Sequence, residues 1–132
     1  MRTINYREWR TVTMCRFIGV ECLAVNALIE LYGANIRRIS FKELADYGLM
    51  VVDQYERVSG QEAVLVFDPD DLQGLVINYS DFFDIEQEGK TRYLCLKNDS
   101  NIHEVKKRFR WTLSYSMVRA LSQVSVMTAM QH

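Results

Sequence analysis

The chain has 132 residues, enough for one domain that buries a core without disulfides or a structural metal. Apolar residues make up 48% of the chain and charged residues 25%, a globular balance that excludes disorder throughout. Sixteen basic residues against 17 acidic ones give a formal net charge of -1, so the overall charge does not attract the protein to nucleic acid or to an anionic membrane.

The cysteines and the apolar stretches indicate the compartment. Cys15, Cys22 and Cys95 are odd in number, and their spacings fit no disulfide framework, which favours a reducing environment. Residues 1–5 lack the apolar core of a signal peptide. The longest apolar stretch, residues 17–31, is too short and too polar to cross a bilayer. We therefore expect one cytoplasmic domain that contacts no membrane.

Residues 3–18 carry two conflicting signals. Asn5 followed by Glu8 matches a capping box, which opens a helix. Residues 11–17 are β-favouring, and Gly19 weakens any helix that runs through it. Of the two structures, we predict the helix.

The next stretch gives a clearer signal. Apolar residues recur at spacings of three and four from residue 20 to residue 31, which is typical of one helix face. A helix over residues 20–32 is therefore predicted, with Gly33 as its C′ residue. Residues 37–39 predict a short strand.

A second helix and a second strand follow. Ser40 and Glu43 form a capping box that opens a helix over residues 41–57, and the pair Ser59-Gly60 ends it. Residues 62–67 are short, apolar and β-branched, which predicts a buried strand.

The third helix has a strong start. Asp68 can cap it, Pro69 suits the first helical position, and the acids that follow favour the positive end of the helix, here residues 70–80. Two alternating runs around Gly89 then predict a β-hairpin over residues 82–97.

The C-terminal part predicts one long helix. Asn101 and Glu104 form a further capping box, and apolar residues keep spacings of three and four over residues 102–129. Such a helix would span about 40 Å, longer than a small domain needs to cover its own core.

The order of helix, short strand, two helices and hairpin over residues 20–97 resembles a winged helix-turn-helix. Ser40–Ala45 resembles the opening of the second helix in such domains, and residues 79–96 look like the end of the third helix leading into the wing. The pattern is similar to LOTUS-type winged helices, small modules that bind RNA or a protein partner. The resemblance implies an α+β fold: a winged-helix-like core with a small β-sheet or hairpin, here followed by the long C-terminal helix.

The sequence departs from a DNA-reading winged helix at two places. Such domains usually put a basic or amide-rich third helix into the major groove, whereas here carboxylates that repel phosphate lie near both ends of that helix. An extra run, residues 61–67, stands where a tight turn is expected. The acidic surface favours a basic protein partner, or mimicry of nucleic acid. Its candidate contacts are Asp70, Asp71, Asp81 and Asp84.

Three basic groups are the candidates for a nucleic-acid contact. One precedes the second helix, one lies at the hairpin tip, and one lies on the last helix beside an aromatic ring that can stack on a base. They are Arg37, Arg38 and Lys42; Lys90 and Arg92; and Lys106, Lys107, Arg110 and Trp111. Ordinary surface charge is the alternative explanation for each group.

No motif indicates catalysis, a metal or a cofactor. Cys15, Cys22, Cys95 and His103 lack the paired spacing of structural zinc ligands. The cysteines are expected to be buried thiols in the core, and His103 is expected in the first turn of the last helix. Neither His103 nor His132 has the context of a catalytic triad, and phosphate-loop and zinc-protease signatures are absent. We therefore expect no enzyme and no cofactor.

Two functions remain open. The first is a small non-enzymatic regulator or inhibitor that binds another protein, of the size and neutrality of inhibitors carried by phages and mobile elements. Its long last helix would pair two copies through residues 122–130 in a homodimer. The alternative is a winged-helix transcription regulator that binds nucleic acid through the three basic groups.

Overall fold

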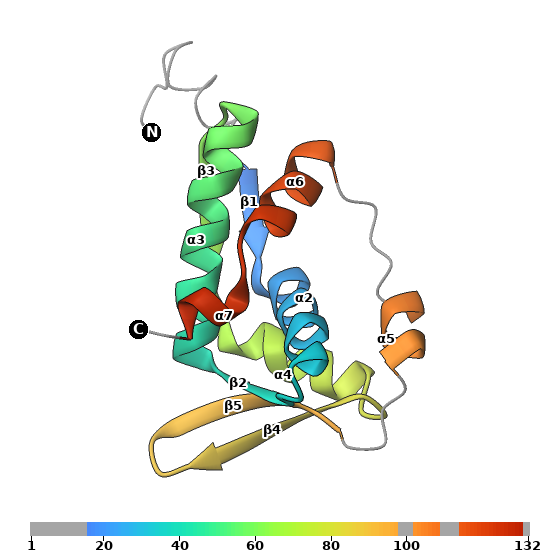
Figure 1. Ribbon diagram of the computed structural model, residues 1–132. Coiled ribbons are helices and arrows are strands. Elements are labelled where there is room, and N and C mark those ends of the chain that lie inside the picture. Colours follow the sequence, from blue (N-terminus) through green and yellow to red (C-terminus); the bar gives the residue numbers. More distant parts are fainter. Residues whose placement is uncertain (1–15, 98–101, 109–113, 131–132) are drawn as a thin grey trace.

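The computed structural model describes residues 16–97, 102–108 and 114–130 (Figure 1). It has the mixed α+β composition that the sequence predicts, with small sheets and several helices. In chain order the elements are β1 (Arg16–Gly19), α2 (Val20–Gly33), β2 (Arg38–Ser40), α3 (Phe41–Ser59), β3 (Ala63–Val66), α4 (Pro69–Asn78), β4 (Phe83–Glu88), β5 (Thr91–Leu96), α5 (Ile102–Arg108), α6 (Tyr115–Gln123) and α7 (Val126–Ala129).

The described strands form two separate sheets. β2, β5 and β4 make an antiparallel sheet in that order, with Ile39 opposite Leu94 and Leu94 opposite Ile85. β1 and β3 make a parallel pair in which Phe17 lies opposite Val64. Figure 1 shows the hairpin of β4 and β5 at one end of the molecule and the β1–β3 pair beside α3 at the other.

The core centres on α2 and α3. α2 buries residues on several sides, and α3 contacts α2, β3, α6 and α7. Gly48 allows α3 to come this close, because a β-carbon there would lie 2.9 Å from the Cδ atoms of Leu65 on β3 and 3.2 Å from Leu23 on α2. The largest fully buried side chains are Tyr47 and Phe83.

The predicted caps at the start of α3 and α4 and the predicted end of α3 at Gly60 are confirmed, whereas α4 ends at Asn78, two residues before the predicted end. The side chain of Ser40 accepts a hydrogen bond from the Glu43 amide, and the Glu43 carboxylate accepts one from the Ser40 amide, each 3.0 Å long. Gly60 ends α3 with a φ of 71° in the left-handed region. Asp68 caps α4 by accepting a hydrogen bond from the Asp70 amide.

The predicted hairpin also forms. Glu88 pairs with Thr91, so its loop is the dipeptide Gly89-Lys90, and Gly89 has a φ of 61°. A glycine with positive φ at the first loop position matches the twist of the flanking strands.

The prediction for the N-terminal part is wrong where the structure describes it. Residues 16–18 belong to β1 and not to a helix, because pairing with β3 satisfies the β-favouring side of the mixed signal. Residues 3–15 lie outside the described residues. Gly33 is still helical rather than the C′ residue, and the left-handed position comes at Asn35, with a φ of 60°.

The prediction of one long C-terminal helix is also wrong. The described segments form α5, α6 and α7, and Val124 and Ser125 interrupt the helical path. Ser114 caps α6 through the Met117 amide, and Ser125 caps α7 through the Met127 amide. Four residues of the predicted stripe are buried in the chain's own core: Val105, Met117, Ala120 and Val124. Ile102 and Met127 are partly buried, and Phe109 and Leu113 lie outside the described residues. The homodimer through residues 122–130 stays a prediction, although the single long helix on which it was based does not form.

No helix within residues 16–97, 102–108 and 114–130 is both long enough and apolar enough to cross a bilayer.

Candidate interaction surface

The β1–β3 pair exposes one apolar face. Along both strands the residues alternate: Ile18 and Ala63 are buried, whereas Phe17, Val64 and Val66 are 65%, 47% and 40% exposed. The strand over residues 62–67 is thus predicted correctly as a strand but wrongly as buried. We call the surface made by Phe17, Gly19, Val64 and Val66 the outer face.

An open apolar face is unusual for parallel strands. Parallel sheets occur almost only where both faces are covered, because their strands are apolar on both sides. α3 covers the inner face, where Leu65 packs near Gly48. Phe17, Val64 and Val66 stay exposed among the described residues, and this part of the chain therefore offers the outer face for a contact.

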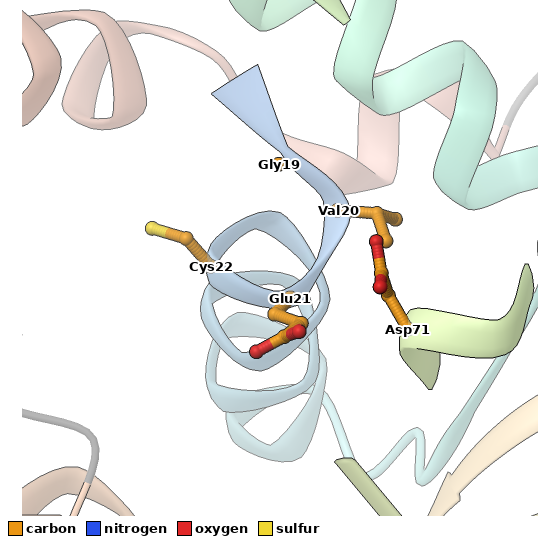
Figure 2. Close-up of a pocket in the computed structure, with 5 residues that line it drawn as sticks. All are labelled: Gly19, Val20, Glu21, Cys22 and Asp71. Carbon is orange, nitrogen blue, oxygen red and sulfur yellow. The ribbon is translucent and has the colours of Figure 1, made fainter. Parts of the chain in front are cut away.

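A hollow opens at one end of the outer face, where β1 passes into α2. Its volume is about 230 Å³, and it is lined by the residues drawn in Figure 2, with Glu21 on the first turn of α2 and Asp71 on α4. A second hollow of about 70 Å³ continues along β1 to Met117 on α6. Both hollows are lined by Gly19 and Cys22, which places Gly19 where the two meet.

Acidic side chains surround this end of the outer face. Val66 pairs with Gly19, and the chain passes directly from β3 into the acidic start of α4. At the other end, Glu62 accepts a backbone hydrogen bond from Arg16. The carboxylates of Glu21 and Asp71 line the hollow, and Asp68 and Asp70 stand next to Asp71 at the start of α4. Such a surface complements a cationic partner.

The thiols of the two described cysteines both have raised pKa values. Burial raises the pKa of the Cys22 thiol, with the charge of Arg16 acting in the opposite direction. Burial, joined by the nearby Glu86 carboxylate, raises the pKa of Cys95 to about 12. Since the thiolate is the nucleophile and the metal ligand, these shifts favour the neutral and less reactive thiol form of both side chains. Cys15 lies outside the described residues.

The basic residue at the start of β2 is neutralised within the chain. Arg38 donates to the Glu88 carboxylate at 2.8 Å, lies 3.6 Å from Glu86, and stacks its guanidinium 4.1 Å from the centre of the Tyr93 ring. The hydrogen bond between them raises the pKa of Arg38 and lowers that of Glu88. A phosphate would have to compete with two carboxylates for this cation.

The other predicted cations near the hairpin also have partners. Arg37 lies over the Tyr32 ring and donates to the Lys97 carbonyl, and Arg92 lies over the Phe41 ring. Lys42 pairs with Asp46 at 3.6 Å. The last predicted member, Lys90, is exposed at the turn of the hairpin.

The third basic group is far from the other two. Lys106 and Lys107 are exposed on α5, and Figure 1 shows α5 and the hairpin tip on opposite sides of the molecule. Arg110 and Trp111 lie outside the described residues. The described members of the three groups therefore do not join into one positive face.

The predicted acidic contacts separate into two places. Asp70 and Asp71 lie at the start of α4, where Asp71 lines the hollow. Asp81 follows α4, about 15 Å along its axis, and Asp84 lies on β4 opposite Cys95. Only the first pair borders the outer face.

The outer face was missed by the sequence reasoning, although its signal is present. Residues 62–67 are apolar and β-branched, which predicts a strand, and the β-favouring residues 11–17 stand before Gly19. Neither pattern shows which side of a strand its own chain leaves uncovered.

Within the described part of the chain, no three His, Cys, Asp or Glu side chains are grouped so that they could hold a metal ion. Comparisons of the chain with protein-family models, curated proteins and solved structures found no match.

Proposed function

We propose that this protein is a small, non-enzymatic regulator or inhibitor that acts by binding another protein through the outer face. The observation that carries the proposal is the exposed apolar side of a parallel strand pair, bordered by carboxylates. An apolar patch with a polar border is typical of a protein-binding site.

A second candidate is a winged-helix regulator that binds nucleic acid. It is supported by the order α2, β2, α3, α4 and hairpin, and by β2 joining the hairpin in one sheet. The strand β3, inserted between α3 and α4, and the paired state of Arg38 weigh against a DNA-reading version of it. We therefore rank it second.

The two functions separate in a co-purification experiment. Wild type, Phe17→Glu and the control Ile77→Glu, which changes an exposed apolar residue on α4, are used as baits in matched lysates. We expect one protein to be retained by wild type and by the control and to be lost from Phe17→Glu. Equal recovery by all three baits would remove the outer face from the proposal.

Nucleic-acid binding is measured in parallel with the co-purification. Duplex DNA and RNA are titrated between about 50 and 200 mM salt, because phosphate contacts weaken steeply over this range. We expect no salt-dependent binding. Tight binding that falls with salt and is abolished by reversing Lys106 and Lys107 to glutamate would favour the second candidate.

A further inference from the structure

Neither the backbone conformation nor the packing at position 19 requires a glycine. The φ of -81° and ψ of 151° of Gly19 are extended backbone that any residue adopts, and a β-carbon built there meets no atom within 4 Å. It is the N-cap of α2, yet it offers no side-chain hydrogen bond to the helix, as serine or aspartate would. A glycine in such a place leaves room for the close approach of another chain.

The space that Gly19 leaves connects the apolar and acidic parts of the surface. Phe17 is two residues before it on the same strand face, and Glu21 and Asp71 line the hollow on its other side (Figure 2). The hollow, at about 230 Å³, is smaller than the roughly 300–1,000 Å³ of small-molecule sites. Its size and its carboxylates suit one long cationic side chain.

We propose that the outer face docks a basic amphipathic helix of a partner protein. The apolar stripe of that helix lies on Phe17, Val64 and Val66, and one of its lysine or arginine side chains enters the hollow between Glu21 and Asp71. This inference rests on the proposed function and names the partner's binding element. Charge complementarity selects the basic character, since the carboxylates of Glu21 and Asp71 line the hollow and the first turn of α4 holds two acidic residues.

The geometry of the strands selects a helix. Parallel strands are normally covered by helices on both faces, and α3 already covers the inner one. Four residues of β1 extend over about 13 Å, so between two and three turns of helix would cover the pair. The carboxylates that line the hollow also stabilise the N-termini of α2 and α4, and they present the same charge to a partner.

The test uses a labelled synthetic peptide of about 16 residues, long enough to form a helix, with a leucine stripe flanked by lysines. A matched peptide carries glutamate in place of every lysine. Fluorescence anisotropy measures the affinity of each peptide for the full-length protein. We expect wild type to bind the lysine peptide at least about tenfold more tightly than the glutamate peptide, as loss of a central contact commonly costs that much.

Four variants locate the binding. Phe17→Asp and Gly19→Leu should each weaken the lysine peptide at least about tenfold. Their controls are Ile77→Asp, an exposed apolar site on α4, and Gly33→Leu, a glycine with open space at the far end of α2. Both controls should bind like wild type, which also shows that a new aspartate or leucine does not unfold the protein.

Three results would overturn the inference: equal binding of the two peptides, unchanged affinity in Phe17→Asp and Gly19→Leu, or self-association by light scattering that Phe17→Asp abolishes. The last would identify a second copy of this chain as the occupant. If a partner is captured through Phe17 while the lysine peptide has no advantage, the proposed function stands and the basic helix does not. If neither a partner nor the peptide depends on Phe17, both proposals fail.

Discussion

The substitution Tyr47→Phe tests the polar contact between the two central helices. The side chain of Tyr47 on α3 is 1% exposed, and its hydroxyl oxygen accepts a 2.7 Å hydrogen bond from Nδ2 of Asn26 on α2. Phenylalanine keeps the ring and leaves the half-buried amide without this partner. A hydrogen bond contributes about 0.5–1.5 kcal/mol net, and more where its partner stays buried and unpaired. We expect the free energy of unfolding near pH 8 to fall by about 1–1.5 kcal/mol.

The pKa of the same hydroxyl gives a second measurable effect. Burial, together with the negative charge of Glu30, raises the pKa of Tyr47 from 10.0 to about 12, while the hydrogen bond from Asn26 acts in the opposite direction. The unfolded chain therefore ionises near pH 10 and the folded protein near pH 12. The contribution of Tyr47 to stability is complete below pH 10 and is lost as the pH rises to 12. Two pKa units correspond to about 3 kcal/mol.

Urea unfolding of wild type and Tyr47→Phe between about pH 8 and pH 11.5 measures both effects. Other tyrosines and lysines titrate in both proteins and cancel in the difference. The advantage of wild type should shrink by about 1.4 kcal/mol per pH unit above pH 10 and change sign near pH 11. The control Tyr115→Phe removes an exposed hydroxyl and should leave stability unchanged. A wild-type advantage that stays constant to pH 11.5 would refute the burial of this hydroxyl.

Three further predictions concern helix ends and thiols. Ser40→Ala removes the capping box of α3 and should cost about 1 kcal/mol in urea unfolding, and a cost near zero would contradict the cap. Gly60→Ala should lower the free energy of unfolding by about 1 kcal/mol because the φ of residue 60 is 71°. Gly19→Ser should raise it by up to about 1 kcal/mol because the backbone of residue 19 is extended. Changes of the same sign in the two variants would refute this difference between the two glycines. Cys22 and Cys95 should react with iodoacetamide far more slowly in the native protein than in urea, as followed by peptide mass spectrometry, and equal rates would contradict their burial.

The elements that sequence reasoning predicted best are those whose signals act within a few residues. The bonds between Ser40 and Glu43 span three positions, and the cap from Asp68 to Asp70 spans two. The turn at Gly89 is set by one glycine with positive φ. Such contacts form whatever the rest of the chain does, so their residues alone predict them.

The parallel strand pair could not be predicted in the same way. Phe17 and Val64 are far apart in the chain, and no local rule pairs them. β1 and β3 each show an ordinary strand pattern, and their inner sides are buried only because α3 approaches closely at Gly48. Which side stays exposed is a property of the assembled fold.

The basic groups show the same dependence on distant contacts. Arg37, Arg38 and Lys42 form a positive cluster in the sequence, and Arg38 meets Glu86 and Glu88 only once β2 joins the hairpin. Charge that looks available for phosphate is thereby used inside the chain. Prediction of a binding surface from charge alone fails where such cross-strand pairs form.

The apolar surface available to a partner also lies elsewhere than the sequence indicates. The stripe over residues 102–129 looks surplus to one core, but Val126 is fully buried and its amide donates to the Glu30 carboxylate at 2.7 Å, which holds α7 against α2. A dimer through residues 122–130 would have to uncover side chains that the core already holds, at the cost of their burial. Phe17 and Val64 require no such opening. A partner that binds the outer face gains burial of apolar area that the folded chain leaves exposed, and for that reason we place the interaction there.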